Sequence, residues 1–412
     1  MKYSEKEDPK RRVVITGLGV VSSIGIGVEE FWKNLIAGKS GISEIEAFDT
    51  SAYPTHKGGE VKNFKPENFI DKRKLKHLGR ASQLAIAAAK LAIDDSGLSQ
   101  KDITKAGVIL GTTMGESQIL EELDKAWITH GEDNLTQGLI TSYLTNNLSV
   151  NTAIELGATG FNAVMPTACS SGNYAIGYSF DLIRTGHSEL MFCGGSDAFS
   201  RIAFTGFNRL LAMAPEKCQP FDKNRRGMML GEGAGILILE SLYHAEKRKA
   251  NIYAEVLGYG LGCDAHHMTQ PSEEGIVNCM EKAIKEAKIS KEDVDYISAH
   301  GTGTPQNDKT ECAAIKKVFG KNYKTIPCSS IKSMLGHTMG AASAIEAMSC
   351  CFAIRDKIAP PTINYDTLDK ECAIDCVPNE ARKINIRVAV NNSSAFGGNN
   401  ACLVLAFPTS YK

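Results

Sequence analysis

The strongest constraint on the fold of this chain is a long-period internal repeat. Residues 88–115 predict an alanine-rich helix, a short acidic turn and an apolar strand that ends in small residues. Residues 280–304 predict the same elements in the same order, and Asp293 follows its counterpart Asp102 by 191 residues. Solenoid repeats have periods of only ~20 to 50 residues. We therefore expect two copies of one α/β unit packed into a single body.

A second, looser correspondence joins two segments that begin with a polar residue and continue as a small, largely apolar helix. Residues 167–184 contain Cys169, residues 331–355 contain His337, and each of these two residues has a glycine three positions later. The offset between them is 168 residues. Because a helix that is apolar on all sides lies in a protein interior, these segments predict a pair of central buried helices.

Several other segments are continuous apolar runs, typical of strands that helices cover on both faces. They are residues 12–16, 190–193, 235–240, 252–257, 386–390 and 402–406. We expect a layered α/β fold with helices between and outside the sheets. No linker separates the halves, so we expect one integrated body, divided as a tail of residues 1–11, an N-terminal half of residues 12–257 with insertions, and a C-terminal half of residues 258–412.

Composition excludes several classes of function. The 46 Lys and Arg nearly balance the 47 Asp and Glu, so the chain has no general attraction for nucleic acid or acidic membranes. The charged start lacks a signal peptide, and no run approaches the roughly 18 apolar residues of a spanning helix, which predicts a cytoplasmic protein without membrane insertion. The twelve scattered cysteines predict reduced thiols, and neither Cys372 and Cys376 nor His266 and His267 have zinc-site spacing, so we expect no metal.

Cys169 is the candidate nucleophile. It lies between a predicted strand and a predicted helix, and a helix N-terminus favours an anion, which is expected to lower the thiol pKa. The alternative is a buried structural cysteine. The small residues Ser170, Ser171 and Gly172 leave room for an acyl chain and favour the nucleophile.

Two histidines are the candidate hydrogen-bond donors. His300 follows an apolar strand and precedes a loop of glycines and threonines, which is typical of a ligand-facing side chain. His337 begins the second central helix, where imidazolium is disfavoured, so we expect a neutral ring that donates to developing negative charge. Each histidine, taken alone, is more typical of an ordinary hydrogen-bonded polar residue than of a catalytic one. At the ends of repeated units, they and Cys169 are expected to share one site.

A glycine-containing loop near the C-terminus completes the candidate site. In residues 396–398, Phe-Gly-Gly, the glycines allow a backbone N–H to approach a thioester oxygen. A nucleotide site is not predicted, because the chain has no complete phosphate-binding fingerprint and the GEGAG of residues 231–235 runs into a strand.

Four of these motifs together resemble a known family. TACSSG (167–172), AHGTGTPQND (299–308), KSMLGHTMGAA (332–342) and SSAFGGNN (393–400) are similar to the motifs of the elongating β-ketoacyl-[acyl carrier protein] synthases of the thiolase superfamily, most closely the type II enzymes. The resemblance runs from about Arg12 to Phe407. It implies a thiolase-like five-layer αβαβα fold with two pseudo-repeated halves, and a homodimer or a heterodimer with a related subunit.

The resemblance also implies a reaction. Cys169 would take an acyl chain from an acyl carrier protein, and His300 and His337 would stabilise the enolate formed as malonyl-carrier loses carbon dioxide. The product would be a β-ketoacyl-carrier two carbons longer, in fatty acid synthesis. The resemblance places Lys332, paired with Glu346, as the organiser of the site.

Further roles follow from the same resemblance. The backbone amides of Cys169 and Phe396 would form the oxyanion hole, with Phe396 as the gate. Four other residues would contact the substrate. Thr302 and Thr304 would contact the pantetheine arm, and Met114 would line the acyl tunnel. Thr269 is the fourth expected contact. No bound cofactor is implied, because the phosphopantetheine is carried by the acyl carrier protein.

Differences from the family pattern leave other functions open. The usual Phe-Gly-Phe-Gly-Gly gate is here Ser394-Ala395-Phe396-Gly397-Gly398, and Arg226-Gly227-Met228 replaces the usual Asp-Gly-Phe. Such changes suit the ketosynthase subunit of a reducing type II polyketide or polyene pathway. A non-catalytic partner subunit and a Cys-His hydrolase are two further alternatives.

The strongest local charge feature is a basic run in a nearly neutral chain. Lys72, Arg73, Lys74 and Lys76 lie close together in the sequence. We interpret them as a docking patch for an acidic carrier protein, where electrostatic steering would raise the association rate. The alternative is a solvated helix face.

Overall fold

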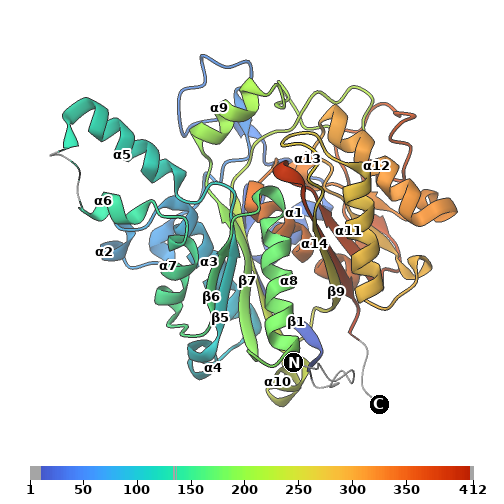
Figure 1. Cartoon of the computed structure of the whole chain (residues 1–412), viewed down its shortest axis with the longest axis horizontal. Coiled ribbons are helices and arrows are strands. Elements are labelled where there is room, and N and C mark those ends of the chain that lie inside the picture. The colour runs from blue at the N-terminus through green and yellow to red at the C-terminus, as the bar shows by residue number, and fades with distance from the viewer. Residues whose placement is uncertain (1–10, 133–134, 136, 409–412) are drawn as a thin grey trace.

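The computed structural model describes residues 11–132, 135 and 137–408, so most of the predicted tail of residues 1–11 lies outside it. Its main strands form two blocks of five (Figure 1). The N-terminal block runs in the order β6 (Asn162–Met165), β5 (Gly107–Gly111), β7 (Leu190–Asp197), β8 (Gly233–Ser241) and β1 (Val13–Ser22). The C-terminal block runs in the order β11 (Cys328–Ser329), β10 (Tyr296–Ser298), β14 (Val388–Ser393), β15 (Asn399–Ala406) and β9 (Ala254–Cys263).

The two blocks have the same strand directions. In each block the first three strands are parallel, and the last two add antiparallel. The blocks meet where three residues of β1, Val13 to Ile15, pair antiparallel with Ala254 to Val256 of β9. The matching directions confirm the prediction of two copies of one α/β unit. The predicted division at residues 257 and 258 falls inside β9, and the strand pattern groups all of β9 with the second half.

The helix–turn–strand repeat is present in both halves. Helices α3 (Arg80–Ser96) and α4 (Gln100–Lys105) precede β5, and helix α11 (Glu273–Glu286) and the short 3₁₀ helix η5 (Lys291–Asp293) precede β10. The turn residues act alike, because Ser99 accepts a hydrogen bond from the amide of Asp102 and Ser290 forms a capping box with Asp293.

The second correspondence is confirmed, but with a different offset. The 3₁₀ helix η4 (Ala168–Ser170) leads into α8 (Ser171–Arg184), and η7 (Met339–Ala341) leads into α14 (Ala342–Asp356). Ala168 and Met339 begin these turns, and both have a left-handed φ of 52°. The structural offset is therefore 171 residues, and the offset of 168 was wrong because it aligned two glycines with different roles. His337 precedes the counterpart of Cys169 by three positions.

Five layers follow from the packing of helices on the blocks. Helices α8 and α14 pack against each other between the two blocks. Helices α3 and α7 (Asn147–Leu156) cover the outer face of the first block, and α11 and α12 (Pro305–Phe319) cover that of the second. This arrangement confirms the predicted αβαβα fold, and the central position of α8 and α14 brings their N-terminal ends together.

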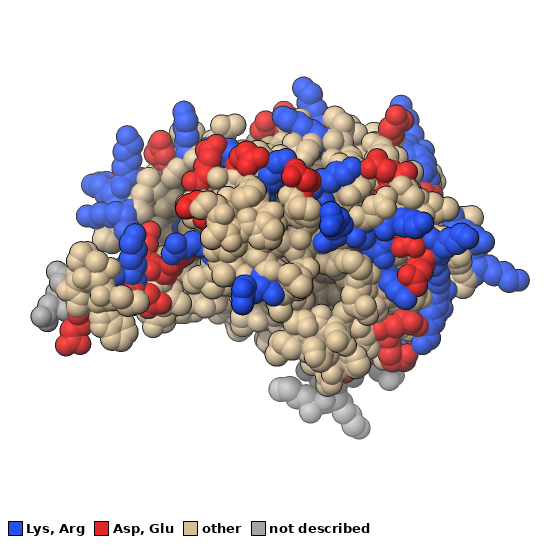
Figure 2. Space-filling view, turned by 90° about the horizontal axis from the view of Figure 1, so that it is seen from above, with Lys and Arg blue, Asp and Glu red and all other residues tan. Residues whose placement is uncertain are grey.

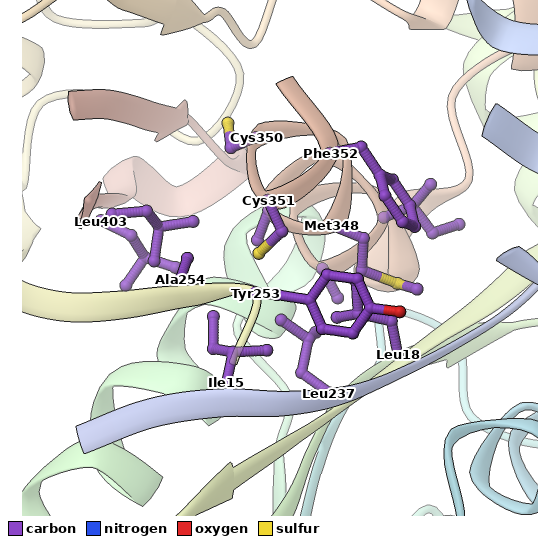
Figure 3. Packing of buried hydrophobic residues seen from close by; sticks show 14 of the residues in the cluster. Ile15, Leu18, Leu237, Tyr253, Ala254, Met348, Cys350, Cys351, Phe352 and Leu403 are labelled. Atoms are coloured by element: carbon purple, nitrogen blue, oxygen red, sulfur yellow. The ribbon is translucent and has the colours of Figure 1, made fainter. Parts of the chain in front are cut away.

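Helix α14 is the centre of the largest core cluster (Figure 3). Its residues Ala342 to Ile354 are all buried. Phe352 and Met348 share this cluster with Leu18 of β1 and Leu237 of β8, and Trp32 stacks on Phe352. Burial of one such side chain stabilises a fold by about 1.5–3 kcal/mol. Because α14 contacts strands of both blocks, its packing joins the two halves.

The remaining elements lie around this body. They are α1 (Val28–Ile36), α2 (Lys72–Leu75), α5 (Ser117–His130), α6 (Gln137–Ser142), α9 (Arg201–Arg209), α10 (Leu242–Lys247), α13 (Lys332–Leu335), the 3₁₀ helices η2 (Pro66–Asn68), η6 (Gly320–Lys324) and η8 (Phe396–Gly398), and the short strands β2 (Gly25–Ile26), β3 (Ser43–Glu44), β4 (Lys57–Gly58), β12 (Ile358–Ala359) and β13 (Arg382–Lys383). Helices α5, α6 and α9 belong to insertions of the first half. Among the described residues, no helix combines the length and the apolar character needed to cross a membrane.

Candidate active site

A cavity of about 340 Å³ brings together Cys169, His300 and His337. Cys169 follows β6 of the first block, whereas His300 and His337 follow β10 and β11 of the second block, which are parallel and end at the same edge of that block. The walls of the cavity include α9 and the start of α12, which lie on the upper side of the molecule (Figure 1). Seen from above, acidic and basic side chains are interspersed around a central area with few charges (Figure 2).

Cys169 lies in η4 at the N-terminal end of α8, with 7% of its surface exposed. Burial raises the pKa of its thiol to about 12, and the charge of Lys332 opposes this only in part. The expectation of a lowered thiol pKa was therefore wrong, because the loss of water outweighs the favourable charges. The thiol is protonated in the free protein at neutral pH, and it must lose its proton when it reacts.

His337 is held as a neutral donor. Burial, and then the charge of Lys332, lower the pKa of its ring well below the usual value. The backbone amide of Met339 donates to Nδ1 of His337 over 3.1 Å, so the ring proton resides on Nε2. Its main chain is fixed as well, because its amide donates to the carbonyl of Met229 over 2.7 Å. The ring therefore offers one N–H group to the cavity.

His300 stands beside His337, with ring centroids 5.4 Å apart and planes at 82°. Burial, Lys332 and His337 lower its pKa well below the usual value, so this ring is also neutral. Within the described chain, Nδ1 of His300 is buried and has no hydrogen-bond partner. Two neutral imidazoles in one cavity can stabilise negative charge that develops on a bound substrate.

Lys332 and Glu346 form a fully buried ion pair behind the histidines. Nζ of Lys332 also donates to the carbonyl of His300 over 2.6 Å. Burial raises the pKa of Glu346 to about 7, and Lys332 opposes this shift. The lysine is thus held next to His300, and its charge adds to the effect of burial in keeping both histidines neutral.

Glu311 was missed by the sequence reasoning. It is buried on α12, and its carboxylate accepts hydrogen bonds from the amides of His300 and Gly301, over 2.7 and 2.8 Å, and from Asn392 over 2.6 Å. The carboxylate therefore fixes the backbone that carries His300. The only signal in the sequence was an acidic residue at a position where α12 faces inward.

The loop around Phe396 closes one side of the cavity. The Phe396 ring is 37% exposed and lies 5.8 Å from the ring of Phe207, and both residues line the cavity. Gly397 and Gly398 have left-handed φ values of 79° and 76°, which favour glycine. Ala395 is extended, a conformation open to any residue, so the change from the family's glycine at this position needs no strain.

Three of the four predicted substrate contacts line the cavity. They are Thr269, Thr302 and Thr304, and the hydroxyls of the last two are 2.8 Å apart. Met114 is not among the lining residues. It packs instead in an apolar cluster with Met228, which does line the cavity. Met228, Phe207 and Ser394 also line the cavity, and sequence reasoning assigned no substrate contact to them.

The predicted docking residues lie on a separate surface. Lys72, Arg73 and Lys74 form α2 and Lys76 follows it, beside α7 and away from α9 and α12 (Figure 1). Arg73 pairs with Asp71 over 2.9 Å, and Lys74 pairs with Glu155 over 2.6 Å, so part of the charge is compensated locally.

The described part of the chain contains no group of three or more His, Cys, Asp and Glu side chains arranged to hold a metal ion. All twelve cysteines lie in this part, and all are free thiols. The cavity contains the thiol of Cys169 and the imidazoles of His300 and His337.

Comparison with known proteins assigns the chain to a class of enzyme with this fold. The model of the beta-ketoacyl synthase N-terminal domain matches residues 10–245, and that of the beta-ketoacyl synthase C-terminal domain matches residues 253–366. The chain belongs to the β-ketoacyl synthase family of acyl-transferring condensing enzymes.

Particular relatives are similar over nearly the whole chain. The 3-oxoacyl-[acyl-carrier-protein] synthase 2 of Coxiella burnetii is 41% identical over 96% of this chain and 99% of its own length. The protein of the same name from Staphylococcus aureus strain N315 is 40% identical over 96% and 98%. The solved structure of the ishigamide ketosynthase/chain length factor matches with a TM-score of 0.94 and 46% identity, over 97% of this chain and 100% of that chain.

Proposed function

We propose that this protein extends acyl chains by decarboxylative condensation with malonyl-[acyl carrier protein], in fatty acid synthesis. The observation that carries the proposal is the shared cavity of a buried thiol and two neutral imidazoles. The relatives named 3-oxoacyl-[acyl-carrier-protein] synthase 2 support the substrate class.

The first half-reaction transfers the acyl chain to the enzyme. The sulfur of Cys169 attacks the thioester carbonyl of the acyl-carrier, and the backbone amides of Cys169 and Phe396 hold the oxyanion. The tetrahedral intermediate collapses with departure of the pantetheine sulfur. The thiol proton of Cys169 passes to that sulfur, so no net charge remains in the buried site. Such oxyanion donors are each worth about 10²–10³ in kcat.

The second half-reaction uses the histidines. Malonyl-carrier loses its carboxyl group as carbon dioxide, and the electron pair of the broken bond forms an enolate. The N–H group on Nε2 of His337 and an N–H group of His300 donate to the enolate oxygen. The carbanion carbon then attacks the acyl carbonyl on Cys169, the thiolate of Cys169 leaves, and it takes up a proton from solvent to restore the thiol. The β-ketoacyl-carrier product is two carbons longer.

Two variants separate these half-reactions. Cys169→Ala is expected to abolish acylation by acyl-carrier, measured as the mass of the acyl-enzyme. His337→Ala is expected to acylate, but to release carbon dioxide from malonyl-carrier at least about 100-fold more slowly, because it loses an enolate donor. A His337→Ala enzyme with full condensation activity would overturn the two-donor mechanism.

A second candidate is a ketosynthase subunit of a reducing type II polyketide or polyene pathway. The 46% identity to the ishigamide ketosynthase/chain length factor and the Ser394-Ala395 gate favour it. Comparison of kcat/KM for saturated and polyunsaturated acyl-carriers of equal length distinguishes the two. Preference for the saturated chain supports fatty acid synthesis, and preference for the polyene supports this alternative.

The partner in both cases is an acyl carrier protein, and α2 is the proposed docking patch. A solved structure similar to this one contains a type II PKS acyl-carrier protein in complex with its ketosynthase. Charge reversal of Lys72, Arg73 and Lys74 is expected to raise the apparent KM for carrier-bound substrates at low salt without changing kcat. Reversal of Lys285, a basic residue on α11, is the control. Unchanged kinetics at low salt would refute this docking patch.

We also propose that the protein forms a dimer through β6. This strand ends the sheet, so one of its edges lacks a neighbour in the described chain. The rings of Phe161 and Tyr178 lie 6.0 Å apart beside it, and both are nearly half exposed. Unpaired edges and apolar patches of this kind are normally covered. Light scattering should give the mass of a dimer for the wild type and of a monomer for Phe161→Asp. A monomeric wild type would contradict the proposal.

A further inference from the structure

Asp197 is a buried carboxylate close to the cavity that the proposed mechanism does not use. It is the last residue of β7, and it is fully buried. Its neighbouring strand β5 is parallel and ends at Gly111, so the loop after β5 passes directly over the carboxylate. The segment that follows His337 lies against the same strand ends.

Four hydrogen bonds converge on this carboxylate. Oδ1 accepts from the hydroxyl of Thr112 over 2.7 Å and from the amide of Met114 over 2.9 Å. Oδ2 accepts from the amide of Thr113 over 2.8 Å and from the amide of Gly340 over 2.6 Å. One side chain therefore ties the loop after β5 to η7. Burial raises the pKa of Asp197 to about 6, and the four donors oppose this shift only in part.

The contact between these two segments leaves no spare room. A Cβ atom on Gly340 would lie 2.5 Å from Cα of Thr112, and one on Gly195 would lie 2.4 Å from the carbonyl oxygen of Gly340. The backbone of η7 is thus wedged onto the ends of β5 and β7. A small displacement of Gly340 must therefore move the neighbouring Met339.

Met339 connects this anchor to the chemistry. Its amide donates to Nδ1 of His337, and that hydrogen bond sets both the orientation of the ring and the position of its proton. The nucleophile segment shares part of this network, because the hydroxyl of Ser171 donates to the carbonyl of Thr112 over 3.1 Å. It also has anchors outside the network, because the side chain of Asn173 donates to Ser393 over 3.0 Å and to the carbonyl of Asn391 over 3.2 Å. Loss of the anchor at Gly340 should therefore affect His337 more than Cys169.

We infer that Asp197 is a positioning residue that orients His337 for malonyl decarboxylation through Gly340 and Met339. The inference rests on the proposed function and assigns a role to a residue outside the cavity. The charge of Asp197 also opposes ionisation of Cys169. Removal of this charge should therefore also favour the thiolate of Cys169, an effect that loss of packing alone would not produce.

The test compares the two half-reactions in Asp197→Asn. The amide group is isosteric but presents N–H groups to backbone donors, so at least one of the four bonds is lost. Carbon dioxide release from malonyl-carrier is expected to fall by at least about ten-fold, since small misplacement of a catalytic group costs up to about 100-fold. Acylation of Cys169 is expected to change by less than about three-fold, and its alkylation by iodoacetamide at pH 8 to become several-fold faster.

Two further variants distinguish a positioning role of Asp197 from a general loss of structure. Thr112→Val removes one donor and keeps the carboxylate, so it should slow decarboxylation less and leave alkylation unchanged. Gly340→Ala forces η7 away from Thr112 and should reproduce the selective loss of decarboxylation even if Asp197→Asn fails to fold. Equal losses in both half-reactions would overturn the inference. If the wild type does not condense at all, the proposed function fails, whereas the alkylation comparison still measures the charge of Asp197.

Discussion

At the scale of residues, the site combines a protonated thiol with two neutral rings. Burial raises the pKa of Cys169 and lowers those of His300 and His337, so none of the three is charged at neutral pH. A site of this kind suits an exchange of thioesters, in which the incoming and outgoing sulfur atoms share one proton. It also suits an enolate, which needs donors that carry no competing charge.

The raised pKa of Cys169 predicts an unusual reaction with alkylating agents. The thiolate is the reactive form, so alkylation by iodoacetamide should rise about ten-fold per pH unit between roughly pH 7 and pH 10, without levelling off. Peptide mass spectrometry of the labelled protein measures the rate at Cys169. An N-acetylcysteine control levels off above about pH 8.5. A plateau for Cys169 below pH 8 would contradict the account.

The ion pair of Lys332 and Glu346 predicts a pH-dependent loss of stability. Lys332→Met leaves Glu346 buried without its partner, which raises the folded-state pKa of that carboxyl further. A raised carboxyl pKa stabilises the fold at low pH, and this contribution is lost as pH rises through the folded-state pKa. The free energy of unfolding should therefore fall by about 3–5 kcal/mol at pH 8, and by less at pH 5.

Urea denaturation of Lys332→Met at both pH values measures this effect. The double variant Lys332→Met/Glu346→Gln is the control, and its difference from the wild type should vary little with pH. Equal destabilisation of Lys332→Met at pH 5 and pH 8 would refute the role of Glu346.

Residue types in the sequence revealed the reacting side chains, but not the buried residues that hold them in place. Cys169 and His300 follow strands and His337 precedes the second central helix, each beside small residues, a pattern that is visible in the sequence. Glu311 and Asp197 act through backbone amides of distant segments, and no local pattern identifies such partners. The thiol pKa was predicted in the wrong direction, because the degree of burial depends on the packing of segments far apart in the chain.

At the scale of elements, the central helix α14 carries the largest share of packing. Phe352 is fully buried against Phe31 and Trp32 of α1 and against Tyr253, which directly precedes β9. Its loss would leave a cavity that the rigid sheets on both sides cannot fill. The histidine segment precedes this helix directly, so stability and function depend on the same packing.

Phe352→Ala is expected to lower the free energy of unfolding by about 3–5 kcal/mol, as large-to-small changes of buried aromatic residues do. Urea denaturation measures the change. Glu246→Ala, on the exposed face of α10, is the control and should stay within about 0.5 kcal/mol of the wild type. A loss below 1 kcal/mol for Phe352→Ala would contradict the central position of α14.

The sequence predicted elements that depend on local patterns, but not features that depend on contacts between distant segments. Helix α14 and the acidic turns at Asp102 and Asp293 were foreseen, because apolar runs and turn residues are local properties of the sequence. The offset of the second repeat was not, since it depends on two left-handed residues, Ala168 and Met339, of types that rarely adopt that conformation. The extent of β9 depends on pairing with β15, which no local pattern defines.

At the scale of the whole molecule, two similar halves create one asymmetric site. The cavity receives Cys169 from the first half and both histidines from the second. The repeat predicted this meeting of segments, because equivalent strand ends face one another across the central helices. Neutral overall charge and the local basic patch on α2 are both compatible with a carrier protein that must dock and leave in every cycle.

Condensation in this cavity is tested by mass spectrometry of the protein and its products after incubation with acyl-carrier and malonyl-carrier. We expect an acyl group on Cys169 and a β-ketoacyl-carrier that is two carbons longer than the starting chain. Release of the free acid without a longer product would indicate a hydrolase and would refute condensation, as would a Cys169 that remains unacylated.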